Sequence, residues 1–299
     1  MLFSSLIFLC GFLPIIIIGY YILPKQWRNV FLLFTSILFY SWGGVSYVVI
    51  LVLSILLNYL IALRINLTKS ITWLRIGLFI NIGILLIFKY LDFFILNLNH
   101  LIHIIPNTTP LPYSNIVLPI GISFFTFQQM SLLWDIYRDK DHQKISFLNT
   151  ALYISFFPQL IAGPIVRYHD IIHQIKHRKE TLKLFNSGIH RFILGLFKKV
   201  IIANQLALLA DNIFDQPQDL LTSSAAWLGI LAYSFQIYYD FSGYSDMAIG
   251  LGRMFGFSIL ENFNFPYTST SIQEFWRRWH ISLSTWFRDY VYIPLGGSR

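Results

Sequence analysis

Long apolar runs recur along the chain, and short basic clusters separate them. The first run covers residues 2–23, and the second covers residues 30–63 with a Gly43-Gly44 pair inside it. A run of about 20 apolar residues can cross the roughly 30 Å hydrocarbon core of a bilayer as an α-helix. In that core every backbone polar group must be satisfied within the protein, so only helices and closed barrels can span it. We therefore predict an all-α, multi-pass membrane protein, with two helices and a turn in the second run.

The composition agrees with this fold class. Of the 299 residues, 56% are hydrophobic and 12% are charged. Such values are typical of polytopic membrane proteins and not of a soluble two-domain chain. The 22 Lys and Arg residues lie in several short clusters and not in one patch, so we expect no nucleic-acid partner. Cys10 is the single cysteine, and the chain shows no metal-ligand spacing, so we expect no bound metal or cofactor.

The basic clusters also predict how the chain is oriented. Further apolar runs lie at residues 76–96, 118–137, 188–210 and 224–251. Loops rich in Lys and Arg lie at residues 64–75 and 167–187, and the positive-inside rule places both in the cytoplasm. A signal peptide would require a basic residue before the first run, and none is present, so we predict a retained first helix. With the basic loops in the cytoplasm, the N-terminus is predicted to be external. The bilayer would be the inner (plasma) membrane.

Residues 147–166 form an apolar segment that lies between two basic loops. A single crossing would leave one of these loops outside the cell. Pro158, Gly163 and Pro164 interrupt helical hydrogen bonding, and Gln159 adds a polar side chain. We interpret the segment as re-entrant or broken, because irregular backbone at membrane depth is tolerated where it is buried in protein or lines a cavity. A plain proline-kinked crossing is the alternative interpretation.

Two carboxylates lie within the last long apolar run. Gln236, Asp240 and Gly243 share one face of the predicted helix, and Asp246 follows one turn later. A charge at the bilayer centre costs about 2.5 kcal/mol or more, so such groups are normally paired. We expect their partners among the arginines of residues 273–297. A structural ion pair between helices and a catalytic role both fit this pattern.

Residues 273–297 concentrate ionisable and aromatic side chains in an otherwise apolar chain. If the segment is read with a helical period, Trp279 lies on a face with other aromatic and apolar side chains. The neighbouring face carries Arg277, His280, Ser284 and Arg288. Glu274 and Arg278 have the spacing of an i,i+4 ion pair. One interpretation is an amphipathic helix at the lipid headgroups. The other is a reactive site, because adjacent arginines would lower the pKa of His280 and keep it neutral, as a general base must be.

Four sequence blocks, at residues 121–138, 151–168, 238–257 and 275–297, closely resemble membrane-bound O-acyltransferases. The bacterial alginate O-acetyltransferases are the most similar branch, and a looser similarity extends to teichoic acid D-alanyl transfer proteins and peptidoglycan O-acetyltransferases. The resemblance implies a bundle of helices around a tunnel. An acyl group from a cytoplasmic thioester, acetyl-CoA in the alginate-like branch, would pass through it to hydroxyls of a cell-envelope or exported polysaccharide, or of a periplasmic acyl-accepting protein.

The resemblance also implies roles for individual residues. The family's histidine in the WRRWH block falls on His280, which becomes the candidate catalytic residue. The supporting residues would be Arg278, Trp279, Ser284, Arg288, Asp240 and Asp246. Members of the family carry a second histidine beyond the last block, usually regarded as the catalytic base, and this sequence ends at residue 299. We therefore expect residues 1–299 to be the N-terminal part of one membrane-embedded acyltransferase domain, and to transfer no acyl groups alone.

Two other functions fit the same residues. A transporter or flippase could use Asp240, Asp246 and the interrupted segment 147–166 as elements of its pathway. A non-catalytic membrane scaffold could instead dock a periplasmic partner. Thioester-dependent transfer, measured against passive or proton-coupled flux, would separate an acyltransferase from a transporter.

Overall fold

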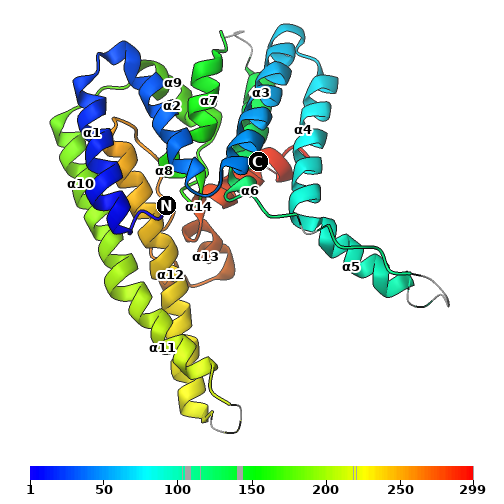
Figure 1. Cartoon of the computed structure of the whole chain (residues 1–299), viewed down its shortest axis with the longest axis vertical. Helices are drawn as coiled ribbons and strands as arrows, with labels where there is room; N and C mark the ends of the chain where they lie inside the picture. Colours follow the sequence, from blue (N-terminus) through cyan, green and yellow to red (C-terminus); the bar gives the residue numbers. More distant parts are fainter. Residues whose placement is uncertain are drawn as a thin grey trace.

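The computed structural model describes residues 1–102, 104, 109–114, 116–139, 144–217, 219 and 221–298. The described residues form helices, turns and irregular segments and contain no strand, which confirms the all-α prediction (Figure 1). The N-terminal half contains a π-helical start (Ile7–Phe12) that runs into α1 (Leu13–Ile22), then α2 (Lys25–Ser41), α3 (Val45–Thr68), α4 (Ile71–Leu85), a π-helical segment (Leu86–Tyr90), α5 (Leu91–Ile102) and α6 (Ile122–Arg138).

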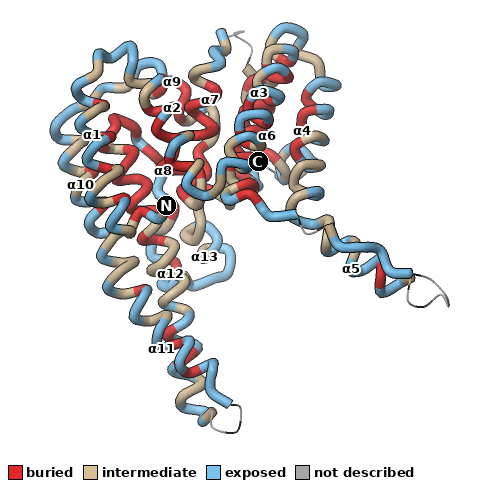
Figure 2. The backbone as a smooth tube through the Cα atoms, viewed as in Figure 1, coloured by how far each residue is buried: buried red, intermediate tan, exposed pale blue. Residues whose placement is uncertain are grey.

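The C-terminal half is helical as well. It comprises α7 (Phe147–Ser155), α8 (Phe157–Leu160), α9 (Tyr168–His177), α10 (Leu182–Phe197), a π-helical segment (Lys198–Ala203), α11 (Asn204–Phe214), α12 (Ser223–Met254), a 3-10 turn (Pro266–Thr268), α13 (Ile272–Arg278), α14 (Ile281–Phe287) and a final π-helical segment (Arg288–Tyr292). Buried residues gather where α2, α3, α6 and α7 pack together and where α12 packs against α8 and α10, whereas α5 and α11 extend away as two arms with mostly exposed side chains (Figure 2).

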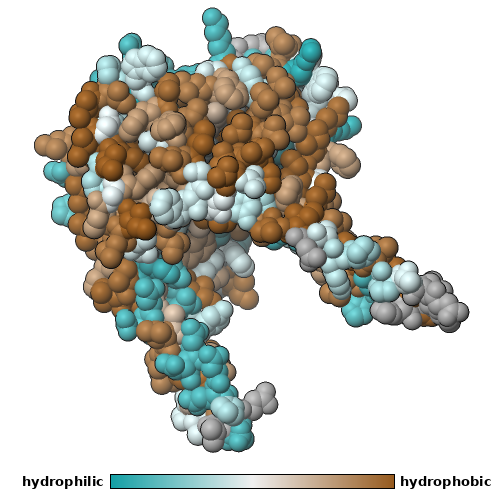
Figure 3. Space-filling view, in the orientation of Figure 1, coloured by the Kyte–Doolittle hydropathy of each residue, from teal (hydrophilic) through white to brown (hydrophobic). Residues whose placement is uncertain are grey.

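Three helical stretches in the described part are long and apolar enough to cross a membrane. They are Val45–Thr68, Ile71–Ile102 and Leu182–Phe214, and a shorter apolar helix covers Ile7–Ile22. The face of the body seen in Figure 3 is largely apolar. Large apolar side chains such as Phe79 are exposed. Apolar side chains facing outward suit a lipid environment, whereas backbone polar groups are satisfied within the helices.

The turn between α2 and α3 lies where the glycine pair predicted it. Helix α2 ends at Ser41 and α3 begins at Val45. Gly44 has a φ of +142°, a conformation that side chains with a Cβ rarely adopt. The two glycines thus reverse the chain within a few residues, so that α2 and α3 pack against each other.

The segment at residues 147–166 is broken, as predicted. Helix α7 ends at Ser155, Pro158 lies in the first turn of the short α8, and the chain is irregular from residue 161 to residue 167. Gln159 is fully buried, and its Nε2 donates to the carbonyl O of Tyr153 at 2.6 Å. Beyond it, Gly163 lies so close to Pro158 that a Cβ on the glycine would be 2.6 Å from the proline carbonyl O. Protein surrounds this irregular backbone, which satisfies the condition under which it is tolerated at membrane depth.

Both ends of this broken segment lie at the same end of α6. The chain leaves α6 after Arg138 and returns where the backbone N–H of His169 donates to Oδ2 of Asp135 at 3.0 Å. The segment is therefore a hairpin and not a straight crossing. This geometry agrees with the re-entrant interpretation and not with the kinked crossing.

Helices α10 and α12 pack through glycines spaced seven residues apart on each helix. Gly188 faces Gly250, and Gly195 faces Gly243. A methyl group at Gly195 would lie 2.5 Å from the carbonyl O of Gly243, so the two backbones are in direct contact. Small residues allow this close approach between membrane helices, where van der Waals packing drives association. The contact fixes the positions of the charged side chains that flank these glycines.

The substitution Gly195→Ala should therefore destabilise the protein. Overpacking of a close contact costs about 1–3 kcal/mol, so the thermal unfolding midpoint in detergent should fall by several degrees. Gly83→Ala is the matched control, because nothing lies within 4 Å of the position that its methyl group would occupy. That control should unfold at or slightly above the wild-type temperature, since alanine favours a helix by about 0.5–1 kcal/mol over glycine. Equal midpoints for the two variants would contradict direct backbone contact.

The helical period that would place Arg277, His280, Ser284 and Arg288 on one face is interrupted in the structure. Helix α13 ends at Arg278, Trp279 is extended, and His280 has a φ of +46° in the left-handed region before α14 begins. The cause is a distant loop that takes over hydrogen bonds at the break. The N–H of Asn264 donates to the carbonyl O of Arg278 at 2.9 Å, and the N–H of Ile281 donates to the carbonyl O of Asn262 at 2.9 Å.

Candidate functional site

The break in the helix divides the predicted polar face. Three of its four residues, Arg277, Ser284 and Arg288, line one groove of about 660 Å³ together with Gln273, Trp276, Ile281 and Thr285. His280 lies at the break and does not line this groove. Its ring packs against the ring of Phe241 on α12, with the two planes nearly perpendicular and 4.7 Å between the ring centroids. The four residues are thus neighbours in space, but the histidine faces a different environment from the arginines.

The imidazole of His280 is in a largely apolar setting. Burial lowers the pKa of His280 from its ordinary value near 6.5 to about 4, so the ring is neutral at physiological pH. The direction of the shift agrees with the prediction from sequence, but the predicted cause is wrong. Arg278 points away from the ring, donating to Oε1 of Glu274 at 2.6 Å and to Oγ1 of Thr268 at 3.0 Å. The predicted pair of Glu274 and Arg278 is confirmed.

A buried asparagine contacts His280 from the loop that breaks the helix. Oδ1 of Asn262 lies 3.1 Å from Nδ1 of His280, and it accepts hydrogen bonds from Ser282 N–H at 3.1 Å and Ser282 Oγ at 2.8 Å. Ser282 Oγ in turn accepts from the N–H of Ile165 at 3.0 Å. The network joins His280 to the broken hairpin. Asn262 and Ser282 were not candidates from sequence, because nothing in their spacing relates residue 262 to residue 280.

Two of the predicted supporting residues, Trp279 and Arg288, and the neighbouring Trp286 make contacts on both sides of the break. Trp279 stacks on Phe275, with ring centroids 5.5 Å apart and planes inclined by 15°. Trp286 is buried, and its Nε1 donates to the carbonyl O of Phe127 at 3.0 Å. Arg288 forms an ion pair with its neighbour Asp289, with 2.7 Å between Nε and Oδ1. These contacts fix both sides of the break, which holds the His280 ring in place.

The two carboxylates of α12 are paired, but not with the predicted arginines. Asp240 lies 2.7 Å from Nζ of Lys199. Asp246 is bridged by Arg191 at 2.7 Å and by Lys198 at 2.6 Å. All three partners come from α10 and the π-helical segment after it, because the glycine contacts bring those residues against α12. The expectation of partners within residues 273–297 is therefore wrong, and the pairs join two helices.

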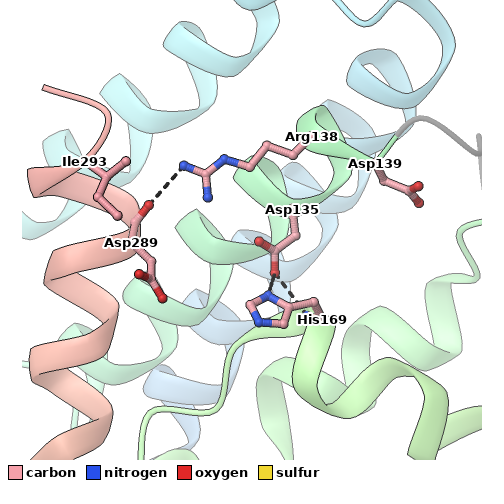
Figure 4. Close-up of a pocket in the computed structure, with 6 residues that line it drawn as sticks. All are labelled: Asp135, Arg138, Asp139, His169, Asp289 and Ile293. Atoms are coloured by element: carbon pink, nitrogen blue, oxygen red, sulfur yellow. Dashed lines mark hydrogen bonds and ion pairs between the residues drawn. The ribbon is translucent and has the colours of Figure 1, made fainter. Parts of the chain in front are cut away.

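A second polar cluster lies where α6, α9 and the final π-helical segment meet, and sequence reasoning did not identify it. It surrounds a pocket of about 540 Å³ lined by Asp135, Arg138, Asp139, His169, Asp289 and Ile293 (Figure 4). Nδ1 of His169 lies 2.9 Å from Oδ2 of Asp135, and Arg138 donates to the carbonyl O of Asp289 at 2.9 Å. The side chain of Asp289 also pairs with Arg167 at 2.5 Å. The cluster therefore ties the end of the His280 segment to α6 and α9.

His169 makes the stability of this cluster depend on pH. Hydrogen bonds to Asp135 and Asp170 raise the pKa of His169 from an ordinary value near 6.5 to about 9. Below the ordinary value the ring is protonated in both folded and unfolded chains, so the stabilisation is fully present. It is lost as the pH rises through the folded-state pKa. Stability should therefore decline as the pH rises from about 6.5 to about 9.

This decline can be measured as the thermal unfolding midpoint between about pH 6 and about pH 10. The His169 side chain is 50% exposed, so solvent screens the pair and we expect a change of only about 1–2 °C. The variant His169→Gln should lose this component of the pH dependence, whereas His173→Gln, at an exposed position on the same helix, should retain it. A wild-type curve that coincides with that of His169→Gln would refute the coupling.

Comparison with known proteins assigns a family. The model of the membrane-bound O-acyltransferase family matches residues 114–299. The protein named "Probable alginate O-acetylase AlgI" of Azotobacter vinelandii is 46% identical over 304 residues, which cover 100% of this chain and 60% of the relative. The protein of the same name from Pseudomonas aeruginosa is also 46% identical, over 100% of this chain and 58% of the relative.

A relative with a different name is nearly as similar. The "Peptidoglycan O-acetyltransferase" of Helicobacter pylori is 40% identical over 335 residues, covering 100% of this chain and 62% of the relative. The chain thus spans about three fifths of the length of these curated relatives. The family model covers more than half of the chain, including the broken hairpin, the paired carboxylates of α12 and His280. The chain belongs to the membrane-bound O-acyltransferase family.

Proposed function

We propose that the complete gene product is an O-acetyltransferase that transfers an acetyl group from a cytoplasmic thioester, such as acetyl-CoA, to hydroxyls of an alginate-like exported polysaccharide. The observation that carries the proposal is the neutral, half-buried imidazole of His280 in a chain 46% identical over its whole length to proteins named as alginate O-acetylases. A cell-envelope acceptor such as peptidoglycan is the second candidate, favoured by the Helicobacter relative.

The proposed reaction asks little of the protein beyond positioning and proton transfer. The acceptor oxygen bonds to the acyl carbon, the carbon–sulfur bond breaks, and the hydroxyl proton passes to a base while the leaving thiolate takes up a proton. A positioned base typically contributes about 10²–10⁴ to the rate. His280 is the candidate proton-handling group among the described residues. Arg277, in the adjacent groove, offers a cation to the phosphates of a donor such as acetyl-CoA.

The proposal includes an orientation in the inner membrane, with the N-terminus external. The basic loops at residues 64–75 and 167–187 would both face the cytoplasm. The arrangement of the helices supports this, because the α3–α4 turn and α9 lie at one end of the molecule, and α5 and the α11–α12 turn lie at the other (Figure 1). A tunnel between these two ends is part of the same proposal.

Cysteine labelling tests the orientation. In a Cys10→Ser background, an impermeant maleimide should label Asp215→Cys from the external side. The same reagent should label Thr68→Cys and Lys179→Cys only after the membrane is permeabilised. All three positions are exposed, but Asp215 lies at one end of the molecule and Thr68 and Lys179 lie at the other. Labelling of Thr68→Cys and Lys179→Cys on different sides would contradict the re-entrant hairpin between α6 and α9.

Transfer of a labelled acetyl group tests the function itself. Membranes containing the complete gene product should move label from acetyl-CoA to alginate or to another polysaccharide in a base-labile ester. Isolated peptidoglycan in parallel reactions identifies the second candidate acceptor. A transporter or flippase would be favoured if no acceptor becomes labelled and if a solute or lipid crosses the membrane in a way that depends on Asp240 and Asp246. Neither transfer nor flux would favour a non-catalytic scaffold.

A further inference from the structure

We infer that a pocket between the end of α1 and the start of α10 binds an anionic phospholipid, with the phosphate at lysine side chains and an acyl chain against apolar walls. The pocket has a volume of about 360 Å³ and is lined by Tyr21, Glu180, Thr181, Leu182 and Phe185. None of these residues belongs to the His280 segment. A lipid bound here is therefore a ligand additional to the donor and acceptor of the proposed reaction.

The pocket lies where several helices begin or end, at the level of the lipid head groups. Helix α1 ends at Ile22 and α10 begins at Leu182. The hydroxyl of Tyr21 donates to the carbonyl O of Met254, the last residue of α12, at 2.7 Å. Trp27, in the first turn of α2, is 54% exposed, and tryptophan is enriched at membrane–water interfaces. A phospholipid in this leaflet can therefore reach the pocket with its head group.

Exposed lysines lie on both chain segments that form the pocket. Lys179 and Lys183 flank the lining residues in the turn between α9 and α10, and Lys25 begins α2, four residues after Tyr21. None of these three lysines forms a salt bridge with another described residue. Basic segments beside membrane helices attract anionic lipids, and basic pockets between such helices hold their head groups. The lysines thus give the pocket a rim that is complementary to a phosphate.

The carboxylate in the pocket wall does not oppose an anion, because two arginines overcompensate its charge. Oε1 of Glu180 accepts from the Tyr20 hydroxyl at 2.8 Å, and it lies 3.0 Å from Arg28 and 3.7 Å from Arg178. The two arginine side chains are only 12% and 6% exposed, and neither pairs with a second carboxylate in the part of the chain that the structure describes. One positive charge therefore remains beside the pocket, where the protein screens it less than water would.

The remaining walls are apolar and preformed. The rings of Tyr21 and Phe185 meet edge to face, with 5.6 Å between their centroids. Leu182, at the first position of α10, is 75% exposed next to Lys183. A phospholipid likewise joins an apolar chain to an anionic phosphate. The pocket therefore matches a whole lipid better than it matches a free phosphate, which would leave the apolar walls uncovered.

Titration of the complete gene product in mild detergent tests this site. Phosphatidylglycerol should raise the thermal unfolding midpoint by several degrees, because a ligand that binds only the folded state stabilises it. Phosphatidylcholine with the same acyl chains has no net charge and should raise the midpoint much less. Equal stabilisation by the two lipids would overturn the inference. Glycerol phosphate should leave the midpoint unchanged, and a rise as large as that with phosphatidylglycerol would show a site for soluble phosphates instead.

Charge substitutions locate the effect. The double variant Lys179→Gln, Lys183→Gln should bind phosphatidylglycerol roughly 20–30-fold more weakly, since each lysine near a membrane surface contributes about fivefold. Leu182→Gln, which keeps both lysines, should also weaken binding. The matched control is Arg64→Gln, Lys144→Gln, which removes two exposed positive charges elsewhere and should bind as the wild type does. Equal affinities of the two double variants would overturn the inference. Loss of acetyl transfer would refute the proposed function and leave this result intact.

Discussion

Replacing His280 with asparagine in the complete gene product should lower acetyl transfer by about 10²–10³-fold, because the reaction loses the imidazole as a hydrogen-bonding group that stabilises the transition state. Asparagine is chosen for a structural reason. His280 has a φ of +46°, and asparagine tolerates the left-handed region better than alanine does. The amount of folded protein and its unfolding midpoint should therefore remain close to those of the wild type. The measurement is the initial rate of label transfer from acetyl-CoA to polysaccharide.

His173→Asn is the matched control for this variant. It makes the same chemical change at an exposed position on α9, away from the break between α13 and α14. Transfer by this control should equal that of the wild type. Wild-type turnover by His280→Asn, in protein that unfolds normally, would show that the imidazole serves packing against Phe241 and not the reaction.

The substitution Asp246→Asn should lower the stability of the protein strongly. The Asp246 side chain is only 7% exposed, and it accepts from both Arg191 and Lys198. Removing one member of a buried pair leaves a charge without compensation and costs roughly 3–5 kcal/mol. The thermal unfolding midpoint in detergent should fall by many degrees, and the amount of protein in the membrane should fall with it.

Two further carboxylates calibrate this effect. Asp240 pairs with Lys199 but is 35% exposed, so Asp240→Asn should be less damaging than Asp246→Asn. Asp219 is exposed in the turn before α12, and Asp219→Asn should change stability by about 0–1 kcal/mol. Equal tolerance of substitution at Asp246 and Asp219 would mean that the ion pairs between α10 and α12 contribute nothing.

Features that depend on local sequence were predictable here. The turn at Gly43-Gly44 and the interruption around Pro158 follow from backbone conformations that these residues impose or prevent. The pairing of Glu274 with Arg278 follows from helical spacing alone. In each case the deciding residues lie within a few positions of the feature.

Features that depend on distant contacts could not be predicted. The break at His280 arises because the backbone of residues 262–264 takes over hydrogen bonds of the helix. The partners of Asp240 and Asp246 depend on how α10 lies against α12, which the facing glycines set. The contact between Asp135 and His169 requires the hairpin to return to the end of α6. No periodicity within one segment carries this information.

The two helical arms have a consequence for the lipid around the protein. The arms α5 and α11 are the ends of two longer helical stretches, Ile71–Ile102 and Leu182–Phe214, which contain 32 and 33 residues. At about 1.5 Å per residue each is roughly 48–50 Å long, well beyond the ~30 Å hydrocarbon thickness of a bilayer. Such a mismatch is accommodated by tilting the helix, by thickening the bilayer locally or by extending past it. Because the arms diverge from the body in Figure 1, a thinner or thicker membrane should act first on their tilt and leave the His280 site undisturbed.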